Sequence, residues 1–327
     1  MTLFLLAVIG GFILLVWGAD RFVVGAAATA RNLGVSPLII GLTVVGFGTS
    51  APEMLVSGVA AWQGNPGLAV GNAIGSNVTN IALILGFTAL ICPLKVASQT
   101  LRREMPVLLG VMLASLLLLS DQRLDFSDGL ILLGGLVLMV IWMTHLGLRD
   151  RNRTPDPLLA EFTDEIPADM RLPVALTWLA LGLGVLLASS RMLVWGAVGI
   201  AEAIGVSDLV IGLTIVALGT SLPELAASVM SALKGEHDIA VGNVIGSNLF
   251  NLLGVLGLPG VLAPLDISPG VLERDYPVMI GLTVLFLLMA YRFRDRPRRI
   301  NRFEGGLLLA CYAAYQGLLY WQSQPQF

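Results

Sequence analysis

Ten nearly continuous apolar runs, each about 20 residues long, dominate the sequence. An unpaired backbone amide or carbonyl is costly in lipid, and a helix pairs these groups within a single segment. With 327 residues, of which 56% are hydrophobic and 13% charged, the chain is too apolar for a soluble domain. We therefore predict an all-α integral membrane protein with ten transmembrane helices. The predicted spans are residues 2–26, 36–62, 68–92, 104–120, 128–148, 172–197, 207–233, 239–263, 275–292 and 304–322.

A block of fifty residues occurs twice in the chain. Residues 37–86 and 208–257 are related by a constant displacement of 171 positions, and 25 of the 50 residues are identical. The first copy contains GLTVVGFGTSAPE and GNAIGSNVTN, and the second contains GLTIVALGTSLPE and GNVIGSNLFN. A duplicated polar stretch inside an apolar chain is typical of a transporter.

The distribution of cationic side chains predicts the orientation. If both termini face outward, fifteen Lys and Arg residues fall on the cytoplasmic side, and Arg123 and Arg274 fall on the opposite side. Five spans precede the polar segment 149–170 and five follow it, so the second half enters the membrane from the opposite face. We predict a five-helix repeat over 1–148, a cytoplasmic linker over 149–170 and an inverted five-helix repeat over 171–327. Both termini are therefore expected on the outer face of the membrane.

Two acids, Glu53 and Glu224, lie near the middle of predicted spans two and seven. Insertion scales assign about 2.5–3.5 kcal/mol to a comparable acid at the centre of a membrane helix, so each needs a compensating cation or proton. Residues three and four positions apart on a helix share a face. The resulting oxygen-bearing stripes are Thr49, Ser50 and Glu53; Thr220, Ser221 and Glu224; Ser76 and Asn80; and Ser247 and Asn251.

Proline predicts that the second and seventh helices are interrupted beside these stripes. Pro52 and Pro223 each remove an amide donor and block the bond to the preceding turn. We expect carbonyls freed there, those of Gly46 and Ala217, to join the site. Carboxylate, hydroxyl, amide and carbonyl oxygens without His or Cys make a hard-cation site, in which two carboxylates balance one Ca²⁺ or are shared among several Na⁺.

Four further asparagines accompany the stripes in both copies of the block. Asn72 and Asn243 could help to hold the interrupted backbone, and Asn77 and Asn248 are expected to support packing. The glycines expected to allow close helix approach are Gly71, Gly75, Gly242 and Gly246.

The paired stretches GTSAPE with GNAIGSNVTN and GTSLPE with GNVIGSNLFN resemble the two signature repeats of the sodium/calcium exchanger superfamily, in particular its bacterial calcium/sodium antiporter branch. The likeness covers essentially the whole chain, and it implies a location in the bacterial inner membrane with both termini periplasmic. It implies a central cavity between helices two, three, seven and eight, with alternating access when helices one and six slide. The family's ion ligands correspond to the residues of the four stripes. The family often has an aspartate at one of the two positions that Asn80 and Asn251 occupy, and this chain has asparagine at both.

The sequence thus predicts a secondary antiporter that expels Ca²⁺ using inward Na⁺ flow. The closest alternative uses H⁺ as the counter-ion, with the glutamates taking protons after Ca²⁺ leaves. A cation channel lined by the same oxygens is less favoured, because an inverted duplication with interrupted helices favours alternating access. An enzyme is not expected, since an intramembrane hydrolase would need an acid-base apparatus and the chain has no HExxH motif. We expect inorganic cations and the lipid bilayer as partners, with no cofactor, nucleic acid or obligatory protein partner.

Overall fold

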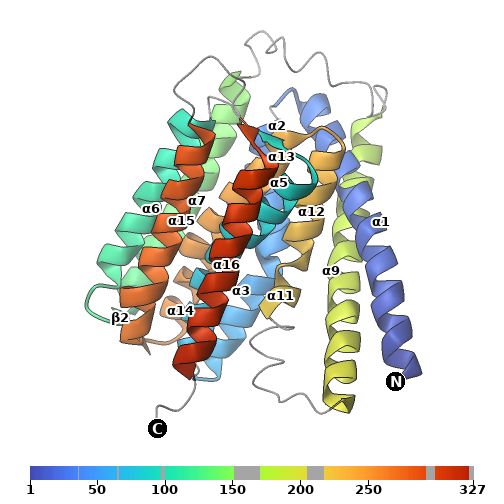
Figure 1. Cartoon of the computed structure of the whole chain (residues 1–327). Coiled ribbons are helices and arrows are strands. Elements are labelled where there is room, and N and C mark those ends of the chain that lie inside the picture. The colour runs from blue at the N-terminus through green and yellow to red at the C-terminus, as the bar shows by residue number, and fades with distance from the viewer. Residues whose placement is uncertain are drawn as a thin grey trace. The chain divides into compact units, whose positions relative to one another are not determined.

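The computed structural model describes residues 1–35, 37–64, 66–96, 100–150, 170–204, 217–291 and 299–323, and these residues are almost entirely helical (Figure 1). Six of the described helices are long and apolar enough to cross a membrane. They confirm the prediction of an all-α membrane protein; the count of ten spans and the inversion of the halves stay predictions. The linker predicted over 149–170 lies almost wholly outside the described residues. The six helical stretches are Thr2–Leu33, Gly41–Trp62, Leu68–Ile91, Phe126–Leu146, Leu172–Ile200 and His237–Leu262.

The chain packs as two compact units, and each unit takes parts from both halves of the sequence. Unit 1 comprises residues 1–53 and 139–246, and unit 2 comprises residues 54–138 and 247–327. The divisions fall inside three helices, α3 (Gly46–Trp62), α7 (Phe126–Asp150) and α13 (His237–Phe250).

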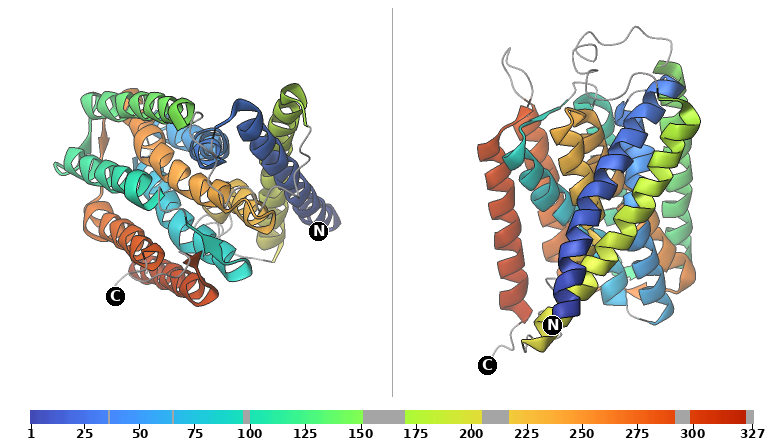
Figure 2. Two further views of the ribbon diagram at one scale, coloured as in Figure 1. Left: turned by 90° about the horizontal axis from the view of Figure 1, so that it is seen from above. Right: turned by 90° about the vertical axis from the view of Figure 1, so that its right-hand side faces the viewer.

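Unit 1 is built around two long helices that lie side by side, α1 (Thr2–Leu33) and α9 (Leu172–Ala203) (Figure 2). Their close approach depends on glycine. A Cβ at Gly25 would lie 2.8 Å from both the Ala175 carbonyl oxygen and Leu179 Cα, and a Cβ at Gly182 would lie 2.6 Å from Phe22 Cα. The core of this unit joins α1 and α9 to residues of the shorter helices. Those elements are α2 (Pro37–Ile40), the π-helical segment η1 (Gly41–Val45), α12 (Leu222–Leu233) and, through Ile239, α13. The short helix α11 (Ala217–Thr220) lies against α9.

Glycine also brings η1 and α13 together within unit 1. A Cβ at Gly246 would lie 2.8 Å from Leu42 Cα, and one at Gly41 would lie 3.2 Å from Gly242 Cα. The expected close approach is confirmed at these two glycines of the second copy. No described atom lies within 4 Å of a Cβ built at Gly71 or Gly75, so the expectation finds no support for the first copy.

Unit 2 contains four further π-helical segments among its described residues, and two short antiparallel strand pairs. Strand β1 pairs with β4 through Leu94 and Ile300, and β2 pairs with β3 through Leu124 and Leu265. The C-terminal helix α16 packs against α5 and η2. The elements are α4 (Pro66–Val78), η2 (Thr79–Leu85), α5 (Gly86–Ile91), β1 (Leu94–Lys95), η3 (Thr100–Glu104), α6 (Met105–Leu118), β2 (Arg123–Leu124), η5 (Asn251–Val255), α14 (Gly257–Leu262), β3 (Leu265–Asp266), η6 (Val271–Asp275), α15 (Tyr276–Ala290), β4 (Arg299–Ile300) and α16 (Arg302–Ser323).

The two proline-containing helices differ from one another. The seventh predicted helix is interrupted at Ser221, whose backbone (φ −91°, ψ 3°) separates α11 from α12. The interruption predicted at Pro52 is wrong, because α3 runs continuously from Gly46 to Trp62 with the proline inside it. One proline removes one amide donor, which a helix tolerates when its other turns are intact. The irregular backbone of this helix lies in the wide turn of η1, which ends seven residues before Pro52.

Candidate functional site

Unit 1 buries both acids of the duplicated block. Glu53 on α3 is 1% exposed and Glu224 on α12 is 2% exposed. The Ser50 hydroxyl donates to Glu224 Oε1 at 3.4 Å, and Thr49 also hydrogen bonds to this acid. The fold therefore brings Thr49, Ser50 and Glu224 together, although Glu224 lies 174 positions after Ser50 and 175 after Thr49.

Asn243 of α13 ties the two acidic helices together. Its Nδ2 donates to the backbone oxygen of Glu224 at 3.1 Å and to Ser228 Oγ at 2.8 Å. Its Oδ1 lies 3.2 Å from the Thr49 hydroxyl, which can donate to it. Asn243 thus bonds to the backbone of α12 three residues after the interruption at Ser221, and its role in holding the interrupted backbone stays a prediction. The equivalent bond in unit 2 runs from Asn72 Nδ2 to Ser57 Oγ at 2.9 Å.

The remaining predicted ligands of unit 1 lie on the same elements. Ser221 is buried at the interruption and Thr220 precedes it, half-buried. The Gly46 carbonyl lies 3.4 Å from the Thr49 hydroxyl, so this predicted oxygen adjoins the acidic stripe. Ala217 is the first residue of α11.

Ser190 of α9 compensates for the proline in the seventh helix. Pro223 cannot donate an amide hydrogen to the carbonyl of Gly219, four residues earlier. The Ser190 hydroxyl donates to this carbonyl at 2.9 Å. The sequence analysis did not identify Ser190, because a partner 29 residues away on another helix leaves no spacing signal.

We expect the variant S190A to lower the stability of the protein by about 1–3 kcal/mol, because a buried carbonyl loses its donor. The measurement is thermal unfolding of the purified protein in detergent. The matched control is S189A: Ser189 is also buried, but its hydroxyl donates at 3.0 Å to Leu186 O of its own helix. Equal melting temperatures for the two variants would contradict this account of Gly219.

Unit 2 buries the other four predicted ligands. Ser76, Asn80, Ser247 and Asn251 are each at most 7% exposed. Asn80 lies in η2, and Asn251 is the first residue of η5. A π-helical turn is wider than an α-helical turn and is frequent at functional sites. Two bonds join the repeats here: Asn80 Nδ2 donates to Asn248 Oδ1 at 3.0 Å, and Asn251 Nδ2 donates to Asn77 Oδ1 at 3.1 Å.

Three of the predicted ligand side chains carry a buried oxygen without a hydrogen-bond donor. Within the described part of the chain, Glu224 Oε2, Asn80 Oδ1 and Asn251 Oδ1 accept no hydrogen bond. Buried acceptors are rarely left unsatisfied, and a bound cation would satisfy them. The oxygens of a carboxylate and of amides suit Ca²⁺ or Na⁺. Among the described residues no group of three or more His, Cys, Asp or Glu could hold a metal.

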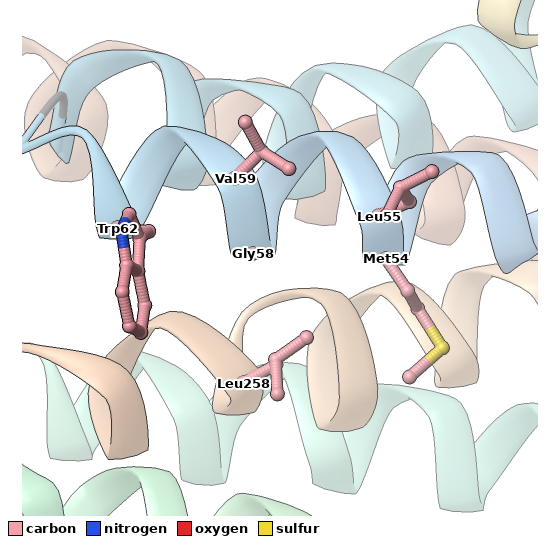
Figure 3. Close-up of a pocket in the computed structure, with 6 residues that line it drawn as sticks. All are labelled: Met54, Leu55, Gly58, Val59, Trp62 and Leu258. Carbon is pink, nitrogen blue, oxygen red and sulfur yellow. The ribbon is translucent and has the colours of Figure 1, made fainter.

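An apolar pocket in unit 2 is a different feature. It lies between α3 and α14 with a volume of about 230 Å³, and its lining carries no carboxylate, hydroxyl or amide oxygen (Figure 3). Such a lining cannot ligate a cation. The lining residues are Met54, Leu55, Gly58, Val59, Trp62 and Leu258.

The comparisons with known proteins agree on one family. The sequence profile described as "Sodium/calcium exchanger protein" matches residues 3–145 and 174–321. CaxA of Alkalimonas amylolytica, which carries the provisional name of an antiporter, is 52% identical over 98% of this chain and 98% of its own. The "Inner membrane protein YrbG" of Escherichia coli is 43% identical over 96% of this chain and 95% of its own. A solved structure of the sodium-calcium exchanger NCX_Mj matches with a TM-score of 0.83 and 32% identity, covering 97% of this chain and 99% of that one.

Proposed function

The chain belongs to the sodium/calcium exchanger family, and from this premise we propose that it is a secondary antiporter that exports Ca²⁺ in exchange for Na⁺ across the bacterial inner membrane. The names of its relatives support Ca²⁺ antiport and a membrane location. The direction and the counter-ion are part of the proposal. No enzymatic activity is proposed, because the family consists of exchangers.

One observation carries this proposal: unit 1 buries two carboxylates, and Glu224 Oε2 accepts no hydrogen bond from the described residues. A buried carboxylate is unstable unless a cation or a proton compensates its charge. One Ca²⁺ balances both charges. Na⁺ ions can occupy the same oxygens when Ca²⁺ has left, and alternate occupancy of one ligand set is what exchange requires.

We assign ion-ligating roles to the four oxygen-bearing stripes and to two backbone carbonyls. The hydroxyls near Glu224 and the unsatisfied amide oxygens of unit 2 support this assignment. The proposed ligands are Thr49, Ser50, Glu53, Ser76, Asn80, Thr220, Ser221, Glu224, Ser247, Asn251 and the carbonyls of Gly46 and Ala217.

Protons are the alternative counter-ion. A carboxylate buried in a membrane helix can carry a proton when Ca²⁺ leaves, and both Glu53 and Glu224 are buried. A proton needs no hydroxyl ligands, whereas the paired hydroxyl stripes favour Na⁺ as the counter-ion.

The counter-ion is measured with the purified protein in liposomes. We expect Ca²⁺ uptake under an imposed Na⁺ gradient and no uptake when only a pH gradient is imposed. Uptake with the pH gradient alone would identify a Ca²⁺/H⁺ antiporter. Absence of Ca²⁺ uptake under both the Na⁺ gradient and the pH gradient would overturn antiport. Electrical recording separates the channel alternative, because a channel passes ions far faster than an exchange cycle.

The proposed topology places both termini outside and the 149–170 segment in the cytoplasm. The cation distribution supports it, since fifteen Lys and Arg residues then face inward. Single cysteines introduced after Phe327 and in the 149–170 segment, in a background without Cys92 and Cys311, should react from opposite faces with an impermeant thiol reagent. Labelling of both from one face would contradict the inverted arrangement.

A further inference from the structure

Four buried asparagine side chains in unit 2 form two reciprocal pairs. Asn251 donates from Nδ2 to Asn77 Oδ1, and Asn80 donates from Nδ2 to Asn248 Oδ1. All four side chains are at most 1% exposed. At the repeat displacement of 171, Asn77 corresponds to Asn248 and Asn80 corresponds to Asn251. The two bonds are therefore equivalent in the duplicated block.

Each bond determines which end of an amide remains available. A side-chain amide has an acceptor oxygen at one end and a donor nitrogen at the other. The nitrogens of Asn80 and Asn251 are engaged, and their oxygens accept no hydrogen bond from the described residues. The oxygens, which can ligate a cation, are therefore left without a hydrogen bond from the described residues. The nitrogens, whose hydrogens would repel a cation, each donate to another asparagine.

Met279 fixes the orientation of one pair. Asn77 Nδ2 lies 3.4 Å from the sulfur of Met279, and a thioether sulfur can only accept a hydrogen bond. The nitrogen of Asn77 must therefore face Met279, which turns its oxygen toward Asn251. The second pair lacks this support, since Asn248 Nδ2 has no acceptor among the described residues.

We propose that Asn77 and Asn248 are positioning residues: they hold the amides of Asn251 and Asn80 in the orientation that presents an oxygen to the transported cation. This inference rests on the proposed function and adds to it two residues that do not themselves ligate the ion. Partners of metal ligands that act in this way fix the ligand's orientation and contribute to metal affinity. Without its partner, the Asn251 amide can rotate and present N–H groups to the cation.

The first test is the concentration dependence of Ca²⁺ uptake by N77L, in which a side chain of similar size cannot accept a hydrogen bond. We expect the apparent Ca²⁺ affinity to fall by about 10–100-fold. The apparent Ca²⁺ affinity should fall less in N248L, because Met279 fixes the orientation of Asn77 and no described acceptor does so for Asn248. The matched control is T88V: Thr88 is also buried in unit 2, and its hydroxyl donates to Ile84 O of its own helix at 2.7 Å.

A compensating substitution separates orientation from packing. An aspartate presents an oxygen whichever way its carboxylate turns, so N251D removes the need for an orienting partner. We expect N77L to cost less than about twofold in Ca²⁺ affinity when introduced into N251D, against about 10–100-fold in the parent protein. The pair N248L and N80D provides an independent repetition of this cycle.

The outcomes distinguish this inference from the proposed function. Absence of Ca²⁺ uptake by the parent protein would overturn the proposed function itself. Normal uptake by the parent together with an unchanged affinity in N77L would overturn the positioning role alone. An equal loss in the parent and N251D backgrounds, or failure of N77L to fold in both, would assign Asn77 to packing and also overturn it.

Discussion

Replacing Glu224 by glutamine is expected to abolish Ca²⁺ transport and to leave folded protein. The substitution removes one of two buried carboxylates, so a doubly charged ion meets only one balancing charge. Loss of a buried charged partner typically costs about 2–5 kcal/mol, which corresponds to a loss of affinity of about 30-fold to several thousandfold. The measurement is Ca²⁺ uptake into liposomes, and E53Q should behave in the same way.

Thermal unfolding without Ca²⁺ or Na⁺ distinguishes lost ligation from lost folding. Burying an uncompensated carboxylate is costly and burying a neutral amide costs less, so E224Q should unfold at a temperature no lower than the parent protein under these conditions. The matched control is S231A on the same helix, where the buried Ser231 hydroxyl donates to Ala227 O at 2.7 Å. Full transport by folded E224Q would exclude Glu224 as an ion ligand.

Introducing leucine at Gly25 is expected to disrupt unit 1. A Cβ at this position would lie 2.8 Å from the Ala175 carbonyl oxygen and from Leu179 Cα, and backbone atoms of α9 cannot turn aside as a side chain can. Overpacking a well-packed core costs about 1–3 kcal/mol and occasionally more. We expect G25L to lower the free energy of unfolding by about 3 kcal/mol or more, because every atom of the leucine side chain must fit between α1 and α9. The measurements are the yield of monodisperse protein and its melting temperature.

The control for G25L is the same substitution on the exposed side of α9. Gly184 has no described atom within 4 Å of its Cβ position, so G184L should fold and melt as the parent protein does. An unchanged melting temperature of G25L would show that α1 and α9 do not pack closely in the folded protein.

The duplicated block predicted much of the candidate site because its signals are local. A helix face repeats every three to four residues, so the grouping of Thr49 and Ser50 with Glu53 follows from spacing alone. The burial of Glu53 and Glu224 follows from their position inside long apolar runs, and both are buried in the structure. The hydrogen bond from Ser50 to Glu224 could not be derived in this way, because the two residues are 174 positions apart.

The effect of proline was predictable for one helix and not for the other. Both prolines occupy the same position in the repeat, yet the backbone is interrupted only at Ser221. The local sequence shows that proline lacks an amide donor. It does not show which neighbouring group donates a hydrogen bond to the freed carbonyl. At Gly219 that group is the hydroxyl of Ser190 on α9.

The sequence by itself determined the membrane-helical class, the duplication and the oxygen-bearing stripes, because apolar length, internal identity and helical spacing are properties of neighbouring or aligned residues. Only the tertiary structure decided which way the amides of Asn80 and Asn251 face. The sequence analysis assigned Asn77 and Asn248 to packing, whereas each accepts a hydrogen bond from an asparagine of the other repeat. An amide's orientation depends on the donors and acceptors that surround it, and here folding brings those groups from the opposite half of the chain.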